Sequence, residues 1–207
     1  MAIIHQADLR PTKLELLADW LPSRSWYAGP DGAAVERVAA FRFDDPDGEV
    51  GVETLLVRVN GGPVLQVPLT YRAAPLAGAD EHLVGTTDHS VLGTRWVYDA
   101  CADPVYVSTL LNTMLTGGRE ADEMVETDSG PQRRNPGAEV RGSGGATPVT
   151  VTNHRYADGS EAVIGAGDYE LRIPRVLPAG PADGAYTMIG RWSGQDGELR
   201  LATATTR

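Results

Sequence analysis

Lysine occurs once in this chain of 207 residues, at position 13, although the chain carries 18 basic residues. Enzymes that transfer the γ-phosphoryl group of ATP hold its phosphates with a lysine and cover them with a Gly-rich loop. Lys13 belongs to an expected helix near the start of the chain, and no Gly-rich loop precedes it. The basic residues therefore argue against autonomous phosphoryl transfer.

A glycine-rich run, Gly142-Ser143-Gly144-Gly145, has two interpretations. Backbone N–H groups in such a run can surround an anion, as in a phosphate-binding loop. A phosphate loop normally opens a helix, and no helix is expected after Gly145. We therefore favour a flexible linker over a phosphate site.

An aromatic segment near the N-terminus could bind a sugar. Trp20, Trp26 and Tyr27 offer ring faces, and Arg24 and Asp31 could bond hydroxyl groups. The alternative is that the two tryptophans pin the first helix onto a sheet, because large aromatic side chains dominate core burial. The core interpretation is favoured, since the segment leaves a helix and enters a strand.

Other reactive residue types give weaker patterns. Glu81, His82, Asp88 and His89 do not have the spacing of a metal-ligand pair on one helix, so no metal site is expected. Cys101 is the only cysteine, which excludes an intrachain disulfide, and it is expected to be a buried structural thiol. No catalytic triad or carboxylate pair stands out.

The first half of the chain predicts a helix followed by a meander of strands. Pro11 suits the first helical turn, an apolar stripe follows, and Pro22 ends the helix. Turn residues then separate strands expected at Val35–Phe43, Val50–Val59 and Val64–Tyr71. Shorter strands are expected at His82–Thr87 and Arg95–Asp99.

The second half begins with the clearest helix signal. Asp103 is a suitable N-cap, Pro104 a suitable first residue, and Gly117-Gly118 ends the helix. Residues 119–146 are rich in charge, Gly and Pro, and we expect an exposed, flexible loop there. Further strands are expected at Val149–Tyr156, Glu161–Ile164, Tyr169–Val176, Tyr186–Trp192 and Glu198–Ala204.

The composition limits the partners. A net charge of −10 repels nucleic-acid phosphates and anionic lipids, so neither partner is expected. No signal peptide and no membrane-spanning run is visible, which predicts a cytoplasmic protein. The preference for Arg over Lys, with abundant Ala and Gly, suggests a GC-rich, actinobacterial genome.

Three stretches in this order and spacing resemble one known family. They are Leu16–Gly29, with its Leu-Pro and Arg-Ser-Trp-Tyr residues, Leu65–Arg72, and Trp96–Pro104, with its Tyr-Asp-Ala and Asp-Pro residues. They resemble the N-terminal cap and adjoining lobe of the maltokinases, bacterial enzymes that phosphorylate maltose with ATP. The resemblance covers about residues 10–117, and the tail is similar to the family's kinase-like sheet only loosely.

The resemblance implies a kinase fold of which we expect this chain to contain only the N-terminal part. The family's catalytic groups lie on a C-terminal lobe, which residues 1–207 do not reach, and Arg172 stands where the family's lysine strand would fall. A planar guanidinium does not by default replace a compact ammonium. We expect no catalytic residues and no cofactor. The residues that we expect to contact a ligand are Arg24, Trp26, Tyr27 and Arg172.

These observations predict an α+β fold in two parts. Residues 1–75 are expected to form a cap-like unit, a helix on an antiparallel three-stranded sheet. Residues 76–207 are expected to form a β-rich, kinase-N-lobe-like unit with one clear helix. The expected function is a non-catalytic binding or regulatory role linked to trehalose, maltose and glycogen metabolism, with a protein partner or a homo-oligomer. An enzyme or accessory subunit of α-glucan metabolism, of the glucan-branching type, and a small-ligand binder remain alternatives.

Overall fold

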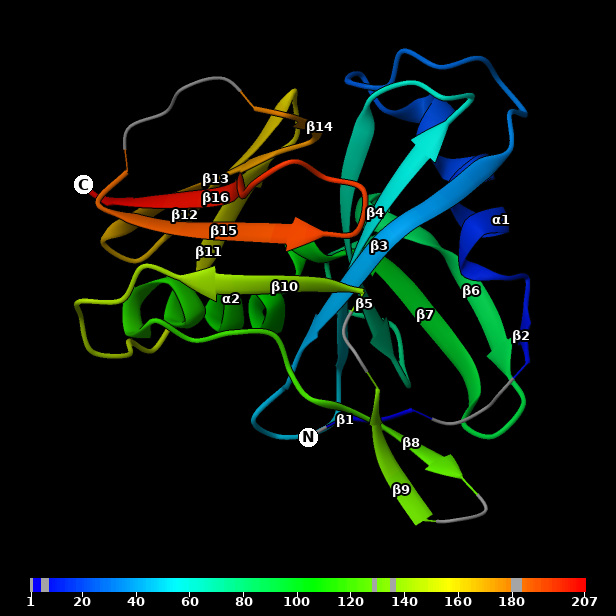
Figure 1. Ribbon diagram of the computed structural model, residues 1–207, viewed down its shortest axis with the longest axis horizontal. Coiled ribbons are helices and arrows are strands. Elements are labelled where there is room, and N and C mark those ends of the chain that lie inside the picture. Colours follow the sequence, from blue (N-terminus) through cyan, green and yellow to red (C-terminus); the bar gives the residue numbers. More distant parts are fainter. Residues whose placement is uncertain (1, 5–7, 128–129, 135–136, 180–183) are drawn as a thin grey trace.

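The protein is built from two large sheets and two helices that pack around two cores. The computed structural model describes residues 2–4, 8–127, 130–134, 137–179 and 184–207. In the described chain, the large sheets are antiparallel throughout, and α1 and α2 lie on different sheets (Figure 1). The expected α+β class is confirmed in this general form, as a mostly β protein with two helices.

The first sheet has seven strands and contains the expected meander. Its order is β2 (Leu9–Arg10), β6 (Leu83–His89), β7 (Gly93–Asp99), β5 (Val64–Arg72), β4 (Gly51–Val59) and β3 (Val35–Phe43), with β14 (Val176–Leu177) also paired to β5. The expected three-stranded sheet is therefore the part formed by β3, β4 and β5. The sheet continues through β6 and β7, across the boundary that we expected near residue 75.

Helix α1 (Lys13–Trp20) covers one face of this sheet. Thr12 is its N-cap, and the Thr12 and Glu15 side chains bond each other's backbone N–H groups in a capping box. Pro11 therefore precedes the N-cap instead of lying in the first turn, where the sequence placed it. After Trp20 the chain tightens into a 3-10 turn, Leu21–Ser23, which contains Pro22.

The second sheet has six strands. Its order is β10 (Ala138–Gly142), β15 (Tyr186–Trp192), β16 (Leu199–Thr206), β13 (Tyr169–Pro174), β12 (Glu161–Ala166) and β11 (His154–Ala157). Helix α2 (Pro104–Thr116) runs along it beside β10 (Figure 1). Its ends are as expected, because Asp103 caps the N-terminus and Gly117 closes the C-terminus in the left-handed region, at φ 73°. Two further 3-10 turns lie at Asp80–His82 and Ala100–Ala102.

Residues 119–146 differ from the expected loop. They contain β10 and a hairpin, β8 (Glu123–Thr127) and β9 (Gly130–Arg134), and β8 pairs in parallel with β1 (Ala2–Ile4). Strand β10 buries Ala138, Val140 and Gly142 and exposes the residues between them. This alternation is the period-2 pattern of a strand with one face on a core. The glycine and arginine content of the segment obscured that pattern.

The two cores lie on opposite faces of the seven-stranded sheet. One joins α1 to side chains that include Leu55, Val57 and Val67. The other joins α2 and the six-stranded sheet to side chains that include Phe41 and Leu56. Strands β3 and β4 thus contribute apolar residues to both cores. The second core spans residues from both of the units expected from the sequence, so it packs the two parts of the chain together.

Candidate functional site

A buried arginine joins the two large sheets. Arg175, between β13 and β14, is fully buried, and its Nη2 donates to Asp99 Oδ2 at 2.5 Å and to Asp158 Oδ1 at 3.2 Å. It also donates to the hydroxyl of Tyr156, which itself donates to Asp99 Oδ2 at 2.7 Å. Asp99 ends β7, whereas Tyr156 and Asp158 come from β11 and the turn after it. This cluster, the Arg175 junction, therefore links one sheet to the other.

Trp26 packs against the Arg175 junction. Its side chain is 8% exposed, and its Nε1 donates to both carboxylate oxygens of Asp158, at 3.0 and 3.1 Å. The Arg175 guanidinium lies 5.2 Å from the centre of its ring, and Trp20 meets it edge-on at 6.0 Å. The ring is therefore packed among protein side chains, as in the core interpretation of this segment.

The two other predicted ligand contacts in this segment lie nearer the surface. The hydroxyl of Tyr27 donates to the carbonyl of Pro30 at 2.9 Å. The guanidinium of Arg24 lies 4.8 Å from the centre of the Trp20 ring, and its Nη1 is 3.8 Å from Asp158 Oδ2. Arg24, Trp26 and Tyr27 are thus gathered beside α1. Their role in binding a ligand remains a prediction.

Arg172 belongs to a different cluster. It lies in β13 between the buried side chains of Leu171 and Ile173, and its own side chain is 43% exposed. It forms ion pairs with Glu170 at 2.7 Å and with Glu161 at 3.6 Å. Arg172 therefore projects from the outer face of the six-stranded sheet, and its role in ligand binding also remains a prediction.

Lys13 is held by a buried carboxylate. Its Nζ lies 2.5 Å from Glu53 Oε2, and the hydroxyl of Tyr71 donates to the same oxygen at 2.8 Å. Arg42 Nη1 lies 3.9 Å from Glu53 Oε1. Burial alone raises the pKa of Glu53, but the charges of Lys13 and Arg42 outweigh it and lower that pKa to about 2. The single lysine therefore neutralises a buried carboxylate under α1.

The glycine-rich run Gly142–Gly145 uses its backbone N–H groups inside the protein. The backbone N–H of Gly142 donates to the carbonyl of Gly118 at 2.8 Å, and that of Ser143 to the carbonyl of Thr187 at 2.9 Å. The N–H of Gly144 donates to the carbonyl of Met114, and that of Ala146 to the carbonyl of Leu115, both at 2.9 Å. The carbonyls of Met114 and Leu115 lie in the last turn of α2, where the helix itself supplies no donors. The run thus caps α2. Because these N–H groups already donate to carbonyls of the protein, they differ from the open N–H groups of an anion-binding loop.

Gly142→Ala is expected to lower the free energy of unfolding by about 2 kcal/mol, because the added methyl overpacks the helix end. A Cβ at Gly142 would lie 1.9 Å from the backbone oxygen of Thr113. Urea unfolding followed by circular dichroism measures the change. Gly159→Ala is the matched control, since its Cβ would meet nothing nearer than the oxygen of Glu161 at 3.4 Å. Equal stability of the two variants would contradict this packing.

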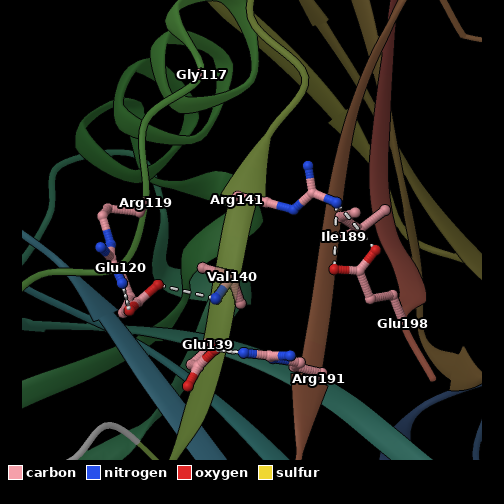
Figure 2. Close-up of a pocket in the computed structure, with 9 residues that line it drawn as sticks. All are labelled: Gly117, Arg119, Glu120, Glu139, Val140, Arg141, Ile189, Arg191 and Glu198. Atoms are coloured by element: carbon pink, nitrogen blue, oxygen red, sulfur yellow. Dashed lines mark hydrogen bonds and ion pairs between the residues drawn. The ribbon is translucent and has the colours of Figure 1, made fainter. Parts of the chain in front are cut away.

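A surface pocket lies where β10 and β15 meet the end of α2 (Figure 2). Its volume is about 370 Å³. The lining residues are Gly117, Arg119, Glu120, Glu139, Val140, Arg141, Ile189, Arg191 and Glu198. Residue Glu139 is the register partner of Arg191, and Arg141 that of Ile189, so the antiparallel pairing of β10 and β15 positions four of these side chains.

Ion pairs organise this pocket. Arg191 donates to Glu139 at 2.6 Å, and Arg141 donates to Glu198 at 3.0 Å (Figure 2). At its base, the buried carboxylate of Glu120 accepts from Arg119 at 3.0 Å and from the backbone N–H of Val140 at 2.9 Å. The pocket is therefore polar, and its arginines lie in ion pairs with its glutamates.

Two other groups considered from the sequence were a thiol and a possible metal site. Cys101 is fully buried, and burial raises the pKa of its thiol well above the ordinary value, which disfavours a reactive thiolate. Among the described residues, no group of three or more His, Cys, Asp or Glu side chains could hold a metal ion. His89 instead accepts the N–H groups of Val91 and Leu92 in a hairpin turn.

Comparison with known families identifies part of the chain. Residues 20–103 match the maltokinase N-terminal cap domain. The resemblance inferred from the sequence is thus confirmed for this region, which contains β3 to β7 and ends at the N-cap of α2. No curated protein matches the chain. In the described part of the chain, no helix is long and apolar enough to cross a membrane.

The Arg175 junction and the pocket were not predicted from the sequence. Asp99 and Trp26 lie in the cap-like region, whereas Arg175 and Asp158 lie beyond it. Arg175 stands between the apolar residues Ile173-Pro174 and Val176-Leu177, which was a signal for a buried ion pair, although it indicated no partner. The pocket had a signal in the alternation along β10, which places its charged residues on one face.

Proposed function

We propose that this chain is a non-catalytic, maltokinase-cap-like protein with a binding or regulatory role linked to trehalose, maltose and glycogen metabolism. The observation that carries the proposal is the position of Lys13. Its ammonium is paired with buried Glu53 under α1, on the face of the seven-stranded sheet that points away from the six-stranded sheet. A lysine in this pair supports packing of the helix and is not placed to hold a nucleotide against the second sheet.

The glycine-rich run supports the same proposal. Its N–H groups cap α2 and bond Gly118 and Thr187. An anion would have to compete with these backbone hydrogen bonds, which satisfy the last carbonyls of the helix. The cap-like match of residues 20–103 supplies the link to maltokinase-related proteins.

The purified chain is expected to form no maltose phosphate from ATP and maltose, because its single lysine is paired with Glu53. Phosphorus NMR of the reaction mixture measures the product directly. An active maltokinase assayed under the same conditions shows that the assay can detect the reaction. Maltose phosphate formed in proportion to the amount of purified chain would overturn the proposal.

A small-ligand binder is the second candidate, and the pocket between β10 and β15 favours it. The pocket volume of about 370 Å³ falls in the range of about 300 to 1,000 Å³ that holds small molecules. Four of its lining side chains come from the paired strands β10 and β15, and strands position side chains more precisely than loops do. In a binding or regulatory protein, such a ligand would be the molecule that the protein binds to exert its role.

A further inference from the structure

We infer that Asn60 is a site of spontaneous deamidation in the folded protein, at which the backbone nitrogen of Gly61 displaces the side-chain amide of Asn60. This inference goes beyond the proposed function and does not depend on it. It rests on the exposure of one hairpin turn, on the open space around Gly61, and on a contrast with the other asparagines that the structure describes.

Asn60 and Gly61 form the tip of the hairpin between β4 and β5. Both residues are exposed, and the N–H of Gly62 closes the turn by donating to the carbonyl of Val59 at 2.9 Å. Asn60 and Gly61 have positive φ, 47° and 70°, as in tight turns that connect antiparallel strands. The nitrogen that would attack is that of Gly61, so the bond that closes the turn does not engage it.

The space around this turn lets the reacting atoms meet. A Cβ built on Gly61 would meet no atom within 4 Å, so neighbouring side chains do not restrict the turn. Glycine also reaches backbone conformations that other residues rarely adopt. The backbone at Asn60 must rotate before the nitrogen of Gly61 can reach Cγ. An exposed loop tip makes such local openings at little cost in free energy.

The two other asparagines that the structure describes lack this combination. Asn112, in α2, donates through its side-chain amide to the carbonyl of Val149 at 3.0 Å and accepts from the N–H of Val149 at 2.7 Å. Asn153 is exposed, but His154 follows it, and a side chain on the attacking residue hinders the approach of its nitrogen. Asn60 is therefore the described asparagine best placed to react.

The reaction exchanges one amide for another and then consumes water. The nitrogen of Gly61 loses its proton and bonds to Cγ of Asn60. The bond from Cγ to the side-chain nitrogen breaks, and that nitrogen takes the proton and leaves as ammonia. Water then opens the resulting cyclic imide at either carbonyl carbon. Opening at Cγ gives aspartate, and opening at the backbone carbonyl carbon gives isoaspartate, in which the main chain runs through Cβ and Cγ.

The products change both the charge of the turn and its backbone. Each product carries a carboxylate where Asn60 has an uncharged amide, which adds a negative charge to a chain whose net charge is −10. Isoaspartate also lengthens the main chain at the turn, and turn geometry helps to set the register of paired strands. Strands β4 and β5 supply Val57 and Leu65 to the core under α1. Deamidation is therefore visible by charge and alters a hairpin at the centre of the sheet.

The test is to incubate the purified chain in mildly alkaline buffer, without denaturant and in parallel with urea. Mass spectrometry of proteolytic peptides measures the conversion at each asparagine, from the mass difference between an amide and an acid. Chromatography of the same peptides resolves aspartate from isoaspartate. We expect loss of Asn60 and appearance of both products in native buffer as well as in urea. Asn112 and Asn153 are expected to stay intact in native buffer over the same time.

Asn60→Gly removes the reacting amide and keeps a residue that suits positive φ, so this variant should fold. It is expected to lose the acidic form that ion-exchange chromatography separates from the unaltered chain. Asn153→Gly is the matched control, since Asn153 is also an exposed asparagine. This control is expected to accumulate the acidic form at the rate of the unaltered chain. Circular dichroism checks the fold of both variants.

Three results would overturn the inference. They are an Asn60 that stays intact in native buffer, conversion of Asn153 as fast as that of Asn60, and an Asn60→Gly variant that accumulates the acidic form as fast as the unaltered chain. Conversion confined to urea counts as the first of these results, because the turn would then protect Asn60 in the folded protein.

Discussion

Replacing Arg175 with methionine is expected to lower the free energy of unfolding by about 4 kcal/mol, because removal of one partner leaves a buried charge without compensation. The charge left behind is that of Asp99, which is 1% exposed. Its remaining side-chain partner in the Arg175 junction is the hydroxyl of Tyr156. Urea unfolding monitored by circular dichroism gives the free energy, and tryptophan fluorescence reports on Trp26, which packs on the altered group.

Arg172→Met is the control for this prediction. Arg172 is also paired with carboxylates and lies three residues away, but its exposed ion pairs are worth at most about 1 kcal/mol. Adding Asp99→Asn to Arg175→Met should restore part of the lost stability, because the unpaired buried charge is then removed. If Arg175→Met proved as stable as Arg172→Met, the junction would not hold the two sheets together in the way described.

Glu53 is expected to make the protein acid-sensitive. Its folded pKa, lowered to about 2 by Lys13 and Arg42 against the effect of burial, lies below its ordinary value of 4.5. A carboxyl whose folded pKa is lowered contributes stability that is present above pH 4.5 and is lost as the pH falls toward 2. The full contribution is about 3 kcal/mol, from 1.36 kcal/mol for each pKa unit. Urea unfolding across this pH range measures the loss.

Substitutions of the residues that contact Glu53 should change the acid sensitivity by different amounts. Lys13→Met removes the larger favourable charge and should both lower the stability at neutral pH and flatten its decline in acid. Tyr71→Phe removes the hydrogen bond to Glu53 and keeps both charges, so its effect should be smaller. Equal acid profiles for Lys13→Met and the unaltered chain would contradict the assignment of Lys13 to Glu53.

The Arg175 junction also bears on the organisation of the chain. Gln66, in the cap-like region, donates through its side chain to the carbonyls of Pro174 and Leu201 in the second sheet, at 3.2 and 2.9 Å. Its backbone N–H bonds the carbonyl of Arg175 at 2.9 Å. The cap-like region therefore shares buried polar contacts with the residues beyond it. That residues 1–75 form a separate domain stays a prediction. In the structure, the packing is continuous across the boundary expected near residue 75.

Much of the secondary structure was readable in the sequence, because its signals are local. Asp103, Pro104 and Gly117 delimit α2 through capping chemistry that involves only nearby backbone groups. The strand expected at Val35–Phe43 and the one at Tyr186–Trp192 have the same bounds in the structure. The segment 119–146 was the main departure. Strand β8 pairs with β1, more than a hundred residues away, and no local pattern reports such a partner.

The sequence by itself determined the cap-like resemblance, the two helices, most of the strands and the presence of one lysine. These depend on residue type and on spacing along the chain. Only the tertiary structure decided that Lys13 pairs with Glu53, that Arg175 meets Asp99, and that three arginine–glutamate pairs line one pocket. The physical reason is that an ion pair depends on distance in space and on burial. Arg175 and Asp99 are 76 positions apart in sequence and 2.5 Å apart in the fold.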